Sequence, residues 1–162
     1  MEVRQIKHMA FAVRSVEKAL ADYARFLGVP ADTRIADWKD SGLRVARFWL
    51  GGIEYQLCEP VKPDHPFVRW MDEKGEGLQH ICYAVDDIDA ALAQAQRQGS
   101  KLRPCPTHKN LGSHKHSEGW VAFLDAAAGG CEIEFMKVYT PEQLAEWKAE
   151  QAAKAAQPAK VG

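Results

Sequence analysis

Three features that this sequence lacks narrow its class before any motif is considered. No apolar run approaches the roughly 20 residues that a helix needs to cross a bilayer, and the N-terminus lacks the apolar core of a signal peptide. The four cysteines, Cys58, Cys82, Cys105 and Cys131, form no C-x-x-C pair, which favours reduced thiols over a disulfide framework or a thiolate zinc site. A net charge of −1 gives no general attraction to nucleic acid or to an anionic membrane. We therefore expect a cytoplasmic protein that binds neither nucleic acid nor a membrane.

The composition is that of an ordinary globular protein. Hydrophobic residues make up 46% of the 162 residues and charged residues 27%, which is enough apolar material for one sizeable core. We predict one domain over residues 1–140. Thr140, followed by Pro141, indicates the start of a further helix. Residues 141–162 are expected to form this C-terminal helix and a tail that frays from Ala152 onward.

The strongest positive signal is an internal repeat. The segment His8–Val13 has the pattern of a strand and is followed by a helical pattern that ends at Gly28. The segment His80–Val85 repeats the strand, and a second helical pattern follows it up to Gly99. The same metal-capable side chain therefore begins the same structural unit twice, which suggests a site built between two half-domains.

Each half is predicted to be a β-α-β-β-β module, with module one over residues 5–60 and module two over residues 78–138. The expected strands are 5–13, 33–38, 43–50 and 53–58 in the first module, and 78–85, 101–103, 120–124 and 131–138 in the second. The expected helices are 15–27 and 86–98, with a short linker helix over 66–74 and a loop over 104–119. Neither module can cover its own sheet, so the two should pack side by side around one concave surface.

Period-two alternation along strands selects the residues that share a face. The last strand of module one carries Gln56 on the face that, in module two, carries Glu134. Together with His8 and His80, the matched halves offer two imidazoles, an amide oxygen and a carboxylate. This donor set suits a divalent cation such as Co, Mn, Ni, Zn or Fe. A single histidine beside a strand is more often a structural hydrogen-bonding group, but four such residues at matched repeat positions favour a metal site.

The repeat resembles the vicinal oxygen chelate superfamily, which includes glyoxalase I, extradiol dioxygenases and fosfomycin-resistance proteins. The resemblance covers about residues 5–138 and is strongest toward the methylmalonyl-CoA epimerases. It is carried by His8–Val13, Val16–Leu20, Gly42–Phe48, Ile53–Pro60, Gly75–Ile88, Leu111–His114 and Gly130–Phe135. The resemblance implies an α+β fold in which two paired modules form a cupped, mostly antiparallel sheet around a metal, with a C-terminal helix added here.

The same resemblance implies an activity and a set of site residues. The metal ligands fall on His8, Gln56, His80 and Glu134. The expected activity is a metal-dependent epimerase or racemase that moves the alpha proton of a 2-substituted acyl thioester, such as methylmalonyl-CoA, through a metal-stabilised enolate. Glu134 would be both a ligand and one base. A small-molecule substrate, in the acyl-CoA class, and a homodimer are expected.

The chain departs from the family pattern at three places. The family's second base, a glutamate, aligns here with Asp40 or Ser41, which makes Asp40 the candidate base. The family's double histidine is Gln79-His80 here. The loop over 107–119 is longer and carries His108, His114 and His116, of which only His114 matches a family position.

Three other functions remain open from the sequence. A glyoxalase I-like lyase would use the same metal cup, but a glutamate in place of Gln56 would favour it. An extradiol dioxygenase uses two histidines and one glutamate on Fe(II), and a fourth ligand at Gln56 argues against that chemistry. A metal-free binding module of the same superfamily is the non-enzyme alternative, and the complete four-residue set argues against it.

Overall fold

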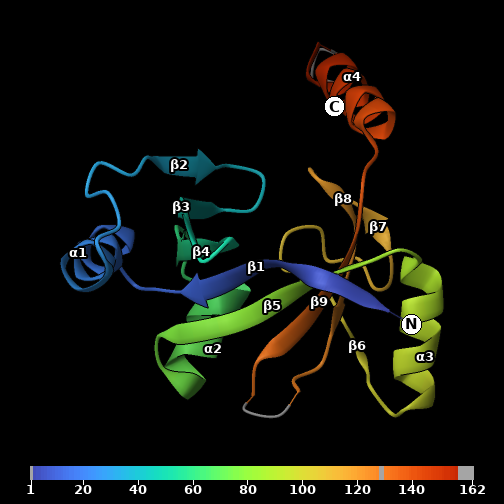
Figure 1. Ribbon diagram of the computed structural model, residues 1–162, viewed down its shortest axis with the longest axis horizontal. Helices are drawn as coiled ribbons and strands as arrows, with labels where there is room; N and C mark the ends of the chain where they lie inside the picture. Colours follow the sequence, from blue (N-terminus) through green and yellow to red (C-terminus); the bar gives the residue numbers. More distant parts are fainter. Residues whose placement is uncertain (1, 128–129, 157–162) are drawn as a thin grey trace.

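A computed structural model describes residues 2–127 and 130–156 of the chain (Figure 1). The fold is α+β, as predicted. The elements, in chain order, are β1 (Val3–Ala12), α1 (Val16–Leu27), β2 (Ile35–Trp38), β3 (Leu43–Leu50), β4 (Ile53–Pro60), α2 (Pro66–Lys74), β5 (Gly77–Val85), α3 (Ile88–Arg97), β6 (Leu102–Arg103), β7 (His114–Lys115), β8 (Gly119–Leu124), β9 (Glu132–Val138) and α4 (Pro141–Ala156).

The described strands form one sheet in which the two repeats lie side by side. The strand order is β2-β3-β4-β1-β5-β9-β8-β6, and β7 pairs with β8. Within the repeats, β1 runs parallel to β4 and β5 runs parallel to β9, while the other pairings are antiparallel. The predicted pairing of two modules in a mostly antiparallel sheet is confirmed. The modules join through β1 and β5, whose antiparallel register places Met9 opposite Ile81.

Helices α1 and α3 occupy equivalent places in the two repeats and lie at opposite ends of the sheet (Figure 1). Helix α1 begins where the Ser15 hydroxyl accepts a hydrogen bond from the Lys18 amide, and it ends at Gly28 in the left-handed conformation. Its residues Val16 and Leu20 pack with Leu57 of β4. Helix α4 projects away from the sheet (Figure 1). Among the described residues, no helix is both long and apolar enough to span a membrane.

Two details differ from the sequence prediction. The loop predicted over 104–119 contains the two-residue strand β7, which pairs with Val121 and Trp120 of β8. Helix α4 continues to Ala156, beyond Ala152 where fraying was expected to begin; alanine, glutamine and lysine are strong helix formers. The rest of the predicted tail, residues 157–162, lies outside the described residues.

Gly119 begins β8 at a point where no side chain fits. An ideal Cβ at this position would overlap the carbonyl oxygen of Lys137 and lie 3.1 Å from Cγ of Met136, both on the neighbouring strand β9. We expect Gly119→Ala to lower the free energy of unfolding by about 3 kcal/mol, because backbone atoms cannot rotate out of the way. Urea denaturation followed by tryptophan fluorescence measures this change.

Gly51→Ala is the matched control for Gly119→Ala. Gly51 has a φ of +57° but open space around its Cβ position, so its substitution carries only the backbone cost of about 1 kcal/mol. Equal losses in the two variants would show that close packing at Gly119 is unimportant.

Candidate metal centre

The antiparallel register of β1 and β5 brings the two repeated histidines together. His8 lies opposite Cys82, and His80 lies opposite Ala10, one step on either side of the Met9–Ile81 pair. The strands that flank β1 and β5 are placed with the same symmetry. Strand β4 places Gln56 beside Ala10 of β1, and strand β9 places Glu134 beside Cys82 of β5. The four residues predicted as ligands therefore sit on the four central strands, about one pseudo-twofold axis.

Three of the four donor groups converge on one point. Nε2 of His8 lies 3.2 Å from Nε2 of His80, and Oε2 of Glu134 lies 3.2 Å from the first nitrogen and 3.1 Å from the second. All three side chains are buried. Metal–ligand bonds of about 2.1 Å place neighbouring ligands of one cation about 3.0–3.4 Å apart. The three atoms already have the mutual spacing of ligands on one face of a divalent cation.

Glu134 is held as a carboxylate despite its burial. Burial alone would raise the pKa of this carboxyl group, but the facing imidazoles of His8 and His80, through charge and hydrogen bonds, hold the pKa well below its usual range. Cys82 has its thiol within 4.8 Å of the donor atoms of His8 and Glu134. Burial, with the charge of Glu134, raises the pKa of the Cys82 thiol well above its usual value. The nitrogen and oxygen donors are therefore the ones prepared for a cation.

A β-bulge precedes each histidine. In the β1–β5 pairing, Lys7 is the extra residue before His8, and Gln79 is the extra residue before His80. At Gln79, which is 2% exposed, the side-chain Oε1 accepts a hydrogen bond from Nδ1 of His80 at 2.5 Å. That bond places a proton of His80 on Nδ1, so Nε2, which faces Glu134, is the nitrogen that can bind a cation.

Gln56 is oriented by its own chain of contacts. Its amide nitrogen donates to Oε1 of Glu54 at 2.7 Å, and Glu54 in turn accepts two hydrogen bonds of 2.8 Å from the guanidinium of Arg47. Burial opposes ionisation of Glu54, but Arg47 and Gln56 outweigh it and lower the pKa of this carboxyl group. Because the contact with Glu54 uses the amide nitrogen, the amide oxygen of Gln56 remains available in the cavity that His8, His80 and Glu134 also line.

The structure does not bring Asp40 into this cavity. Asp40 is exposed on the turn between β2 and β3, and of that turn Ser41 is the residue that lines the cavity. Glu118, which sequence reasoning missed, does line it. Its carboxylate lies 3.1 Å from Nη2 of Arg47 and 3.7 Å from Nζ of Lys7. Glu118 follows β7, and nothing in the local sequence indicates that this strand folds back over the site.

Comparison with known proteins agrees with the fold. The family model for the glyoxalase/bleomycin resistance protein/dioxygenase superfamily matches residues 7–123. Human mitochondrial methylmalonyl-CoA epimerase is 30% identical over 111 residues, which cover 68% of this chain and 61% of the human protein. An ethylmalonyl-CoA/methylmalonyl-CoA epimerase of Cereibacter sphaeroides is 28% identical over 138 residues, which cover 84% of this chain and 99% of that protein.

Solved structures extend the likeness to three dimensions. Two variants of Streptomyces coelicolor methylmalonyl-CoA epimerase, each in complex with 2-nitronate-propionyl-CoA, superpose with TM-scores of 0.66 and 0.65. Each is 20% identical and covers 86% of this chain and 100% of its own. At that identity the likeness shows the fold alone. The family match spans both modules up to β8 and includes His8 and His80. The chain belongs to the glyoxalase/bleomycin resistance protein/dioxygenase superfamily.

Proposed function

We propose that the protein is a divalent-metal-dependent epimerase that moves the alpha proton of a 2-substituted acyl thioester such as methylmalonyl-CoA. The observation that carries this proposal is the convergence of His8, His80 and Glu134 on one point, with Gln56 in the same cavity. The names of the related proteins supply the substrate class, since both describe epimerases of substituted malonyl-CoA.

The residues divide into those that hold a cation and those that move a proton. His8 and His80 would bind through Nε2, Glu134 through Oε2 and Gln56 through its amide oxygen, a set that suits Co, Mn, Ni, Zn or Fe. When bound, the cation supplies a Lewis acid that stabilises the negative charge developing on the substrate oxygens as the alpha proton leaves.

Epimerisation needs one proton acceptor on each face of the alpha carbon. Both imidazoles contact Oε2 of Glu134, which leaves Oε1 as the oxygen that exchanges a proton with substrate. Asp40 remains the base expected from the family alignment, and it would reach the substrate only if the turn over residues 39–42 moved toward the cavity. Glu118 needs no such movement, because it already lines the cavity.

Two further expectations concern the protein as a whole. The homodimer and the cytoplasmic location stay predictions of the sequence. A glyoxalase I-like lyase, which would act on a glutathione hemithioacetal, would use the same metal cup, although a glutamate in place of Gln56 would favour it, and the substrate separates the two activities.

Cation binding is expected to depend on the residue that orients His80. We expect Gln79→Leu to weaken binding at this centre about 10–100-fold, because His80 loses the acceptor that fixes its tautomer. Gln79→Glu keeps an acceptor at the same position and should retain most of the affinity. Titration of the metal-free protein with Co²⁺, in competition with a chromophoric chelator, measures both variants. If Gln79→Leu bound Co²⁺ with wild-type affinity, Gln79 would have no role in orienting His80 for cation binding.

Exchange of the alpha proton tests the proposed bases. With methylmalonyl-CoA in D₂O, wild-type protein should incorporate deuterium at the alpha carbon, and Glu134→Gln should reduce the rate by about 10²-fold or more, as expected for loss of a general base. Mass spectrometry follows the incorporation. A comparable loss in Asp40→Asn or in Glu118→Gln would identify the second base.

Two outcomes of the same exchange assay would contradict the proposal, one for the reaction and one for the bases. No incorporation by the metal-loaded wild type, together with turnover of the hemithioacetal of methylglyoxal and glutathione, would replace the epimerase with the lyase. Unchanged exchange in Glu134→Gln, Asp40→Asn and Glu118→Gln would show that the assigned bases are wrong.

A further inference from the structure

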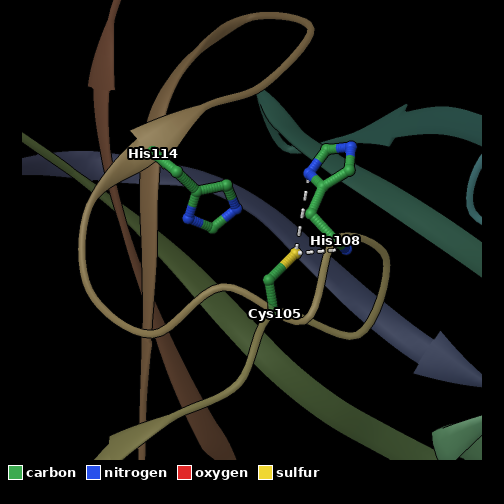
Figure 2. Close-up of side chains that lie close together, drawn as sticks. All are labelled: Cys105, His108 and His114. Carbon is green, nitrogen blue, oxygen red and sulfur yellow. Dashed lines mark hydrogen bonds between the residues drawn. The ribbon is translucent and has the colours of Figure 1, made fainter.

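A second cluster of metal-capable side chains lies in the loop that follows β6. It consists of Cys105 and His108, which form a C-x-x-H segment, and of His114 on β7. Figure 2 shows the sulfur of Cys105 between the two imidazole rings, and one donor atom of each residue lies within 4.8 Å of the other two. The cluster shares no residue with the His8–His80–Glu134 centre.

One ring nitrogen of His114 is buried without a hydrogen-bond partner among the described residues. The side chain is 8% exposed, and its Nδ1 lies 3.0 Å from the carbonyl oxygen of Gly112. A carbonyl oxygen only accepts, so Nδ1 must carry the proton and Nε2 must carry a lone pair. Among the described residues, Nε2 is buried and has no hydrogen-bond partner. A buried, unpaired nitrogen is costly, and a cation would satisfy it.

Cys105 is held in a loop that already points its sulfur at the cluster. Two backbone hydrogen bonds of 2.9 Å, from the Cys105 amide to Asn110 and from the Lys109 amide to Cys105, close the loop. The amide of His108 donates to the sulfur at 3.4 Å, so the sulfur is used as an acceptor, as a thiolate would be. Cys105 is 1% exposed, so a ligand bound to it would be shielded from water on that side.

The spacing between Cys105 and His108 requires little adjustment to bind a cation. Sγ of Cys105 lies 4.0 Å from Nδ1 of His108. Bonds of about 2.3 Å to sulfur and about 2.0 Å to nitrogen would place the same two atoms about 3.5 Å apart in a tetrahedral site. The His108 side chain is exposed and can close this gap. His116, whose ring centroid lies 5.1 Å from that of His108, is the nearest candidate for a fourth ligand.

We propose that Cys105, His108 and His114 form a second cation site, for Zn²⁺ or a similar divalent transition metal, that ties the loop after β6 to strand β7. Binding replaces the S–H bond of Cys105 with a bond from sulfur to the cation, and the proton passes to solvent. The loop residues Pro106 and Thr107 line the cavity of the other centre, so the second cation would fix one wall of that cavity.

Co²⁺ is the probe that distinguishes the two sites. Only the second site contains a sulfur ligand, so Co²⁺ bound there should show a thiolate-to-cobalt charge-transfer band in the near ultraviolet. After metal removal and titration, wild-type protein should bind two Co²⁺ per chain and show the band. Cys105→Ser and His108→Ala should each lose the band and one Co²⁺ per chain. His108→Ala is included because its exposed side chain can be removed without disturbing the core.

Matched variants separate this site from the other centre. Cys131→Ser removes a partly buried thiol outside the cluster and should keep the band. His80→Gln should keep the band and lose the other Co²⁺, whether or not the protein is an epimerase. The proposal is overturned if wild-type protein shows no band, if the band persists in Cys105→Ser, or if it disappears only in Cys82→Ala.

Discussion

The antiparallel pairing of β1 with β5 is the constraint on which the centre depends. Met9 lies opposite Ile81, so His8 and His80 lie one position to either side of the pseudo-twofold axis, with their Nε2 atoms 3.2 Å apart. Side chains alternate along strands, and a slip of one residue in this pairing would turn one histidine to the other face of the sheet. To this centre each repeat contributes one imidazole and one oxygen donor, so its four donors come together only where the two repeats meet.

Burying two imidazoles and a carboxylate is expensive unless each polar atom has a partner. For His80 and Gln56, neighbouring residues meet this requirement by fixing the outer side of the donor. Gln79 accepts the Nδ1 proton of His80, and Glu54, held by Arg47, accepts from the amide of Gln56. The inner atoms are thereby left facing one another, in the arrangement that a cation neutralises. The repeat is imperfect in one useful respect, because Glu134 can accept a proton where Gln56 cannot.

The sequence was sufficient to predict that the four candidate ligands lie together, because their positions follow from period-two alternation in two copies of the same unit. His8, Gln56, His80 and Glu134 could be matched without knowledge of the turns between them. The bulges at Lys7 and Gln79 could not be predicted, since they depend on how two distant strands pair. Glu118 could not be predicted for the same reason, since it reaches the cavity only in the folded chain. Asp40 is the second base expected from the family alignment, but the structure places Glu118, and not Asp40, at the cavity. The cluster of Cys105, His108 and His114 could not be predicted either, because only the folded loop brings His114 close to Cys105 and His108.

Anomalous diffraction from crystals loaded with Co²⁺ tests the metal centre most directly. The geometry predicts an anomalous peak on the pseudo-twofold axis, within bonding distance of Nε2 of His8, Nε2 of His80 and Oε2 of Glu134. A map with no peak there at full cobalt loading, or with a peak bonded instead to the sulfur of Cys82, would contradict this assignment of the centre.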